Sequence, residues 1–264
     1  MDAKFNILGS SSSGNSGLLE VKGIKILIDA GLSCRKLQCL LNEQKTHIEE
    51  IQAVFLTHEH NDHSVGLKGL SRYQQLPIFA NQDTKEAIQS KLSRRPNWKI
   101  FETGKQFEFK SLKIHPFSVP HDAYDPVGFY FQWGNGDLFD PPGSLAWVTD
   151  LGCVPNLVRE RIRNAKILVV ESNYCSKMLE ADNRRPWSLK QRIRSRHGHL
   201  SNDSTFELLN SFGNPCWEKV FIMHLSKDCN DVKMVLQKFK KLNGQRNKFE
   251  TFVIDPETAI PHLV

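Results

Sequence analysis

The segment at residues 57–63 reads Thr-His-Glu-His-Asn-Asp-His and directly follows the apolar run at 53–56. Burying three imidazoles and a carboxylate at the end of a strand without partners would cost several kcal/mol. A bound divalent cation removes that cost, because the same groups become its ligands. The segment therefore predicts a metal site formed by His58, His60, Asp62 and His63.

Spacing within the segment indicates how these ligands divide. His58 and His60 alternate, so on an extended strand end both side chains project to the same side. Asp62 and His63 follow in a loop that can fold back beneath them. This density suits two divalent metal ions better than one, with the first pair on one ion and the second pair on the other. Imidazole with carboxylate favours zinc, with manganese or iron as alternatives.

Recurrent apolar runs predict the strands that position this segment, and the amphipathic stretches between them predict helices. Strands are expected at 5–8, 18–21, 24–28, 53–56, 77–80, 107–119, 127–133, 145–148, 167–170, 220–223 and 251–254. Helices are expected at 33–42, 65–74, 83–92, 155–163, 188–196, 201–211 and 231–242, with Asp83 and Ser201 as N-caps. Strands cluster early in each half, with helices between and after them. This pattern predicts an α/β fold in which two sheets pack face to face with helices outside, a four-layer αββα sandwich.

The chain shows no low-complexity linker and no charge break, so we expect one domain over residues 1–264. An internal echo favours two similar halves. Residues 26–31 read Ile-Leu-Ile-Asp-Ala-Gly and residues 147–152 read Trp-Val-Thr-Asp-Leu-Gly, each an apolar strand that ends in Asp-x-Gly. Residues 133–143 are expected to form a connection longer than a simple hairpin.

The overall composition is that of a globular protein, with 39% hydrophobic and 24% charged residues. No stretch approaches the ~20 apolar residues of a membrane span, and the N-terminus has no signal-peptide pattern. The six cysteines include no Cys-x-x-Cys pair. We therefore expect reduced thiols, a cytoplasmic location and no membrane contact.

The net charge of +6 is concentrated in one segment. Residues 184–196 carry six arginines and lysines, and no acidic residue occurs between 183 and 202. A local basic surface favours a polyanionic partner such as a DNA duplex. The alternative interpretation is a solvated helix face.

A histidine–aspartate motif of this form, His-x-His-x-Asp-His after a strand, resembles the signature of the metallo-β-lactamase fold superfamily. The resemblance implies further residues in chain order. Asp29 would orient a ligand without binding metal, His121 would complete the first metal site, Asp150 would bridge both metals and His224 would complete the second site. His115 lies near His121 and is the alternative, but the Asp-Ala that follows His121 favours the latter.

Five further motifs point to one branch of that superfamily. They are Gly-Ser-Ser-Ser-Ser-Gly-Asn at 9–15, Ile-Asp-Ala-Gly-Leu-Ser at 28–33, Glu-Ser-Asn-Tyr at 171–174, Gly-His-Leu-Ser-Asn at 198–202 and His-Leu-Ser-Lys-Asp at 224–228. Together they resemble the bacterial YycJ/WalJ-like family, related to the RNase Z and RNase J hydrolases, over nearly the whole chain. The resemblance implies a cytoplasmic dinuclear-metal hydrolase with 5′-to-3′ exonuclease activity on double-stranded DNA. Cys175 and Cys229 depart from the family pattern, which favours an acidic and a polar residue there.

Two residues are expected to act in catalysis. The two ions would share a water, lower its pKa toward neutrality and present hydroxide for in-line attack on phosphorus. Asp62 is expected to orient this nucleophile as well as bind metal. The family match places His199 at the rim of the site, where it would contact the scissile phosphate or assist the leaving group. The alternative for His199 is a loop histidine beside the helix N-cap at Ser201.

Substrate contacts are expected from the serine-rich loop at 10–15, from the basic helix and from the later motifs. The loop suits phosphate, although a tight turn under the metal site explains it equally well. Arg192 and Arg196 lie one helical turn apart and form a basic ridge. The predicted substrate-binding residues are Ser12, Ser13, Asn15, Asn173, Arg192, Arg196, Ser201 and Asn202.

Two other functions fit the same residues. A small-molecule hydrolase of this fold, acting on a cyclic phosphodiester, a thioester or a lactone, would use the same metal site. That alternative gains if the basic segment is buried or lies far from the metals. A non-catalytic metal-binding module would predict an incomplete ligand set, whereas every ligand position here is filled. The pattern predicts no oligomeric state.

Overall fold

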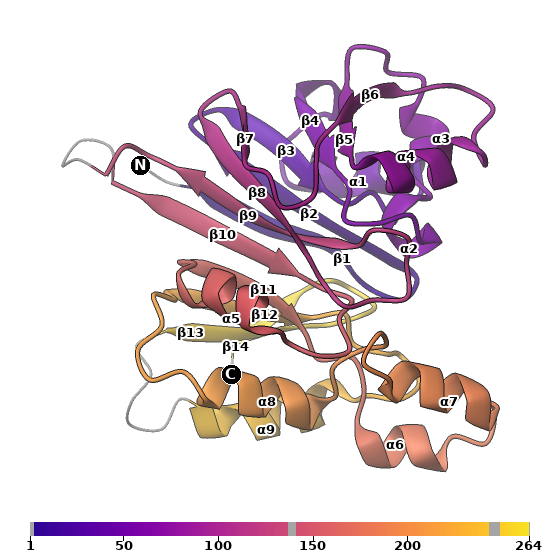
Figure 1. Cartoon of the computed structure of the whole chain (residues 1–264), viewed down its shortest axis with the longest axis vertical. Coiled ribbons are helices and arrows are strands. Elements are labelled where there is room, and N and C mark those ends of the chain that lie inside the picture. The colour runs from indigo at the N-terminus through magenta and orange to yellow at the C-terminus, as the bar shows by residue number, and fades with distance from the viewer. Residues whose placement is uncertain (1–2, 137–140, 243–248, 264) are drawn as a thin grey trace.

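Two β-sheets face each other in the structure, a computed structural model that describes residues 3–136, 141–242 and 249–263 (Figure 1). Within these ranges the first sheet has six strands in the order β1-β2-β3-β4-β5-β6, and the second has eight in the order β14-β13-β12-β11-β10-β9-β8-β7. The first sheet contains β1 (Lys4–Ser11), β2 (Gly14–Val21), β3 (Ile24–Ile28), β4 (Ala53–Phe55), β5 (Pro77–Ala80) and β6 (Asn97–Ile100). The second contains β7 (Phe107–Phe109), β8 (Leu112–Ser118), β9 (Val127–Trp133), β10 (Gly143–Val148), β11 (Ile167–Glu171), β12 (Lys219–Met223), β13 (Glu250–Ile254) and β14 (Pro261–Leu263).

Alternation along the central strands explains why the sheets are layered. In β3, Ile26 packs into the cluster between the sheets, whereas Leu27 packs outward under helices. In β11, Val169 enters the same central cluster, whereas Leu168 packs outward on the other side. A strand that is apolar on both faces must be covered on both. The result is three apolar layers between four structural layers.

Helices cover the outer face of each sheet. The helices are α1 (Cys34–Glu43), α2 (Asn61–Ser64), α3 (Leu67–Leu70), α4 (Gln82–Gln89), α5 (Asn156–Arg163), α6 (Ser176–Ala181), α7 (Trp187–Arg194), α8 (Asn202–Asn210) and α9 (Val232–Phe239), with 3₁₀ turns at Ile48–Glu50 and Lys240–Leu242. Leu41 of α1 and Ile88 of α4 pack under the first sheet, and Leu208 of α8 and Phe239 of α9 pack under the second. The predicted four-layer αββα sandwich is therefore confirmed (Figure 1).

Some local predictions were wrong. Of the helix expected at 65–74, only the four residues of α3 form an α-helix, and α2, α6 and the strands β6 and β14 were not predicted. Ser201 does cap α8, accepting a hydrogen bond from the backbone amide of Ser204 at 3.0 Å. Asp83, in contrast, lies inside the first turn of α4, and Asn81 is the residue that caps it. Residues 137–140 of the predicted long connection between β9 and β10 lie outside the described ranges.

The carboxyl ends of the central strands meet at one edge of the sandwich. Strands β3 and β4 are parallel, as are β10, β11 and β12, and β8 runs in the same direction as β10. Asp29, Asp150 and His224 follow β3, β10 and β12, and all three have positive φ angles of 57° to 59°. Such conformations cost free energy in a non-glycine residue and concentrate at functional sites. This edge is therefore the place to look for chemistry. None of the helices in the described ranges is long and apolar enough to cross a membrane.

Candidate metal centre

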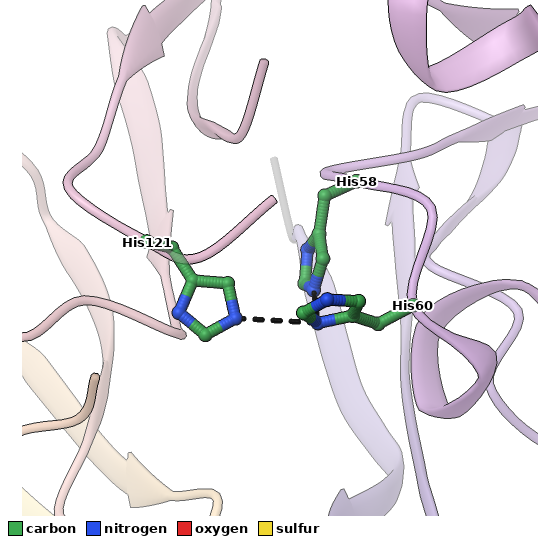
Figure 2. A group of neighbouring side chains, drawn as sticks. All are labelled: His58, His60 and His121. Atoms are coloured by element: carbon green, nitrogen blue, oxygen red, sulfur yellow. Dashed lines mark hydrogen bonds between the residues drawn. The ribbon is translucent and has the colours of Figure 1, made fainter. Parts of the chain in front are cut away.

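Three histidines converge at this edge (Figure 2). Nδ1 of His60 lies 3.1 Å from Nε2 of His58 and 3.3 Å from Nε2 of His121. Two nitrogens bound to one tetrahedral zinc ion at ~2.0–2.1 Å lie about 3.3 Å apart, so this spacing fits a shared ion. The structure thus brings His121 into the predicted first group. His115 instead lies on β8 beside Arg161, 3.3 Å from its guanidinium.

A second group lies beside the first and contains the two remaining ligands from segment 57–63. Nε2 of His63 is 3.0 Å from Oδ2 of Asp150 and 3.5 Å from Oδ2 of Asp62. Nε2 of His224 is 3.6 Å from Oδ2 of Asp62. The other oxygen of Asp150 faces the first group, 3.7 Å from Nε2 of His121. Asp150 therefore lies between the two groups, where we predicted a bridging carboxylate.

Asp29 orients one of these imidazoles. It is fully buried, and its Oδ2 lies 2.8 Å from Nδ1 of His63. The backbone amide and hydroxyl of Thr57 both donate to its Oδ1, at 2.8 and 3.0 Å. These bonds fix the ring of His63 with Nε2 aimed at the second group. A carboxylate behind a ligating histidine is a common feature of metal sites.

Glu171 has the same role in the other half of the molecule, and sequence reasoning missed it. Its Oε2 lies 3.0 Å from Nδ1 of His224 and 3.0 Å from Nδ1 of His199. Its Oε1 accepts hydrogen bonds from the backbone amides of Leu151 and Leu200. One buried carboxylate thus aims two imidazoles. The sequence feature that could have identified Glu171 is its position as an acidic residue at the end of a buried apolar strand.

The histidine pKa values differ between the two groups: they are lowered at His58 and His121 and raised at His63 and His224. Burial lowers the pKa of His121 to about 4, and burial together with His63 holds the pKa of His58 well below its usual value. These imidazoles are neutral and able to bind a cation. Burial opposes protonation of His63, but the surrounding carboxylates, Asp150 first, raise its pKa well above the usual value. Asp150 and other carboxylates likewise outweigh burial at His224 and raise its pKa to about 10.

In the second group, protonated His63 and His224 supply the positive charge that a bound metal ion would otherwise supply. Burial disfavours ionised Asp150, but His224 and His63 lower its pKa well below the usual value. Nε2 of His224 is buried without a hydrogen-bond partner among the described residues. A divalent cation would replace the imidazole protons and satisfy this nitrogen. The residues present therefore fit a divalent metal, and the fold and these clusters together indicate one.

A cavity of about 220 Å³ opens over the centre. His60, Asp62 and His121 form part of its wall, and His199 lines it with a side chain that is 20% exposed. The predicted catalytic pair, Asp62 and His199, therefore faces one space. Ser12 of the β1–β2 turn also lines this cavity.

Most of the other predicted substrate contacts have hydrogen-bond partners within the protein. Asn15 is fully buried, and its Nδ2 lies 3.1 Å from Nε2 of His63, so it contacts the metal centre and not the cavity. Asn173 is buried and donates to the backbone oxygen of His224 at 2.9 Å. Ser201 caps α8 and Asn202 is buried against Ser172 and Asn230. Ser13 is exposed in the turn, where its hydroxyl lies 3.1 Å from that of Ser11. Except for Ser13, these residues are buried, which sequence alone does not show, and their contact with a substrate stays a prediction.

The basic segment adjoins the cavity, but most of its charge is compensated. Leu189, Arg192 and Ile193 of α7 line the cavity. Arg192 pairs with Asp122 at 2.5 Å, and Lys190 is buried and donates from its ammonium to the carbonyl of Glu180. Further ion pairs join Arg184 and Arg185 to Asp182 and Asp228, and Arg194 to Glu180. Arg196 is exposed and has no charged partner among the described residues. The acids responsible come from outside the segment, so counting charges within it overestimated the free positive charge.

Known proteins share this architecture over almost the whole chain. A family model described as the β-lactamase superfamily domain matches residues 25–225. The exodeoxyribonuclease WalJ of Streptococcus pneumoniae is 35% identical over 98% of this chain and 96% of its own, and the exodeoxyribonuclease YycJ of Bacillus anthracis is 32% identical over 97% of both. The metallo-β-lactamase fold protein YhfI of Bacillus subtilis superposes with a TM-score of 0.73 at 16% identity, covering 99% of this chain and 100% of that one. The chain therefore belongs to the β-lactamase superfamily and, within it, to the WalJ/YycJ family of metal-dependent hydrolases.

Proposed function

We propose that this hydrolase is an exodeoxyribonuclease that degrades duplex DNA from the 5′ end. One observation carries the proposal: a three-histidine group and a histidine–carboxylate group adjoin at Asp150 beside a cavity that residues of the basic helix α7 also line. Full-length similarity to two exodeoxyribonucleases supports the same substrate class. The small-molecule alternative would gain from a basic segment buried or far from the metals, whereas α7 lines the cavity with exposed Arg192.

We assign one divalent ion to His58, His60 and His121 and a second to Asp62, His63 and His224, with Asp150 between them, and zinc is the metal that suits this donor set best. When bound, such ions lower the pKa of a water nucleophile and stabilise charge on a phosphodiester. The side chains of the protein supply the remaining functions. The carboxylate of Asp62 reaches the cavity and would orient the attacking water by hydrogen bonding. The imidazole of His199, held by Glu171, would donate a hydrogen bond or a proton to the leaving oxygen.

The environment of the thiols agrees with our expectation of a cytoplasmic enzyme. All six cysteines are free in the structure. Free thiols are the usual state of cysteine in a reducing compartment. We therefore place the proposed activity there.

A nuclease assay tests the proposal directly. End-labelled duplex and single-stranded DNA would be incubated with protein loaded with zinc, manganese or magnesium, and products resolved by length. We expect mononucleotide release from the duplex, beginning at the 5′ end. Asp62→Ala should abolish release, because the change removes both a metal ligand and the group that orients water.

Two further arms make the assay decisive. A cyclic phosphodiester and a thioester presented to the same preparation test the small-molecule alternative. Wild-type protein that cleaves these but leaves DNA intact with all three metals would refute the nuclease assignment. DNA cleavage that persists undiminished in Asp62→Ala would instead show a contaminating nuclease.

A further inference from the structure

Tyr124 is the most exposed large apolar side chain among the described residues, with a relative accessibility of 75%. Its ring and hydroxyl have no hydrogen-bond, stacking or cation–π partner within those residues. A single exposed aromatic residue is normal on a protein surface. Its position decides whether it has a function.

The backbone of Tyr124 lies beside the metal centre. It follows His121 by three residues and Asp122, which lines the cavity, by two. Its backbone amide donates to Oε1 of Glu59 at 3.2 Å. Glu59 in turn lies between His58 and His60 in the chain and is itself buried. The exposed ring is therefore carried by a loop whose first residues, His121 and Asp122, line the cavity on the side of the three-histidine group.

The loop that carries this ring is held on both sides. The carboxylate of Asp122 pairs with Arg192 across the cavity rim at 2.5 Å. The carboxylate of Asp125 accepts a hydrogen bond from Thr103 at 2.6 Å, and its backbone oxygen accepts one from Asn81 at 2.7 Å. A ring on a fixed loop can bind a flat partner with little loss of conformational entropy.

We propose that Tyr124 forms the stacking platform for the terminal base of the DNA strand whose phosphodiester enters the cavity. The inference rests on the proposed function and specifies how substrate is held. An exonuclease must accept any terminal base, and stacking is tolerant of sequence because every base presents a π-face. The exposed, unpartnered ring and its fixed loop, which begins at the cavity wall, meet that need. Hydrogen-bond readout of base edges would select a sequence and is not required.

A base-deletion experiment separates stacking from other roles. Two 5′-labelled duplexes would be compared, one with a normal 5′-terminal nucleotide and one with an abasic residue there. For wild-type protein, kcat/KM should be on the order of 10-fold lower on the abasic duplex. Tyr124→Ala should lower kcat/KM on the normal duplex by a similar factor and leave the abasic duplex unaffected. Tyr124→Phe should behave as wild type, because it retains the ring.

Binding measurements and a control complete the test. Fluorescence anisotropy in an Asp62→Ala background should give the same pattern in Kd. Trp187, a second exposed aromatic residue (59%) that lies on α7 and not on the loop after His121, provides the matched control, and Trp187→Ala should preserve the preference for the normal duplex. Equal preference in wild type and Tyr124→Ala, or a loss in Tyr124→Phe as large as in Tyr124→Ala, would overturn stacking while leaving the nuclease activity established. Wild-type protein that cleaves neither duplex would refute the proposed function itself.

Discussion

Single residues behind the ligands decide how the imidazoles of the second group are aimed. Asp29 and Glu171 come from different halves of the chain, yet each ends or directly follows a central strand and contacts Nδ1 of one histidine of that group. Holding Nδ1 directs Nε2 toward the candidate metal position. The two halves therefore solve the same positioning problem in the same way.

Glu171→Gln tests this role at the residue scale. The amide can still accept hydrogen bonds from the backbone at Leu151 and Leu200, so the fold should persist. It removes the negative charge that fixes His224 and His199. We expect metal affinity to fall 10- to 100-fold, as is typical when such a partner is lost. Competition with a chromogenic chelator would measure it.

The control for that change is Glu207→Gln, because Glu207 is exposed on α8. It should leave metal affinity and stability unchanged, within about 0.5 kcal/mol. Metal affinity of Glu171→Gln equal to wild type would show that Glu171 does not position a ligand.

At the residue scale, the sequence indicates candidate ligands that lie close together in the chain, but it does not show which polar residues are buried. The cluster at 57–63 is local, so its chemistry is visible in the sequence. Glu171 contacts His224, which lies 53 positions away in the chain, and no local sequence pattern predicts that contact. Asn15 and Asn173 carry polar groups that could equally serve a substrate or the backbone. Only the fold shows that they are buried.

At the element scale, the segment that carries Asp62 and His63 packs closely against the backbone just after β3, at Gly31. A Cβ built on Gly31 would lie 1.6 Å from the backbone oxygen of Asp62 and 2.5 Å from the backbone nitrogen of Asn15. No side chain fits there. Backbone atoms cannot move aside as a flexible side chain can, so only glycine at position 31 allows α2 to pack this closely.

Gly31→Ala should therefore displace the loop that carries Asp62 and His63. We expect a loss of about 3 kcal/mol or more in the free energy of unfolding, at the upper end of overpacking effects. Metal content should fall with it. Urea unfolding and elemental analysis after dialysis would measure both quantities.

Gly213→Ala is the matched control, because a Cβ at Gly213 would meet nothing within 4 Å and the glycine has no positive φ. It should change stability by no more than about 0.5 kcal/mol. If both variants unfolded at the same urea concentration as wild type, the close approach at Gly31 would have no energetic role.

Element-scale prediction succeeded for strands with two apolar faces and failed for short or edge elements. Strand β6 contains Lys99 and exposed Ile100 at the edge of the first sheet, so it lacks an apolar run. Helix α6 has six residues, too few to show a period. The helix predicted at 65–74 is shortened to α3 (Leu67–Leu70), and Gly66 before it packs closely against the backbone oxygens of Ala30 and Leu32. Tertiary contacts of this kind are not encoded in local periodicity.

At the scale of the whole molecule, the candidate centre joins both sheets. His63 and Asp29 follow strands of the first sheet, and Asp150, Glu171 and His224 belong to the second. We propose that the chain is one domain for this reason, since neither half holds a complete ligand set. A ligand that binds only the native state stabilises all of it.

Metal removal should thus destabilise the entire molecule in a single transition. We expect one cooperative thermal transition whose Tm falls on treatment with a chelator and recovers with added zinc, by an amount that rises with metal concentration. Calorimetry would measure it, with Asp150→Asn as the variant whose Tm should respond least. Two separate transitions, of which only one shifts with metal, would contradict a single domain.

The distribution of charge over the molecule makes a final, quantitative prediction about DNA binding. Affinity for duplex DNA falls with salt in proportion to the number of phosphates neutralised, at about 0.9 in the log–log slope per contact. Arg185 is paired with Asp182 and Asp228, whereas exposed Arg196 has no charged partner among the described residues. Arg196→Gln should therefore reduce the slope by about 1. Arg185→Gln should leave the slope unchanged, because its charge is already compensated within the protein. Anisotropy titrations from low to moderate salt, in an Asp62→Ala background, would measure both slopes. Equal reductions would mean that the ion pairs of the basic segment open on binding and that all its arginines contact phosphate.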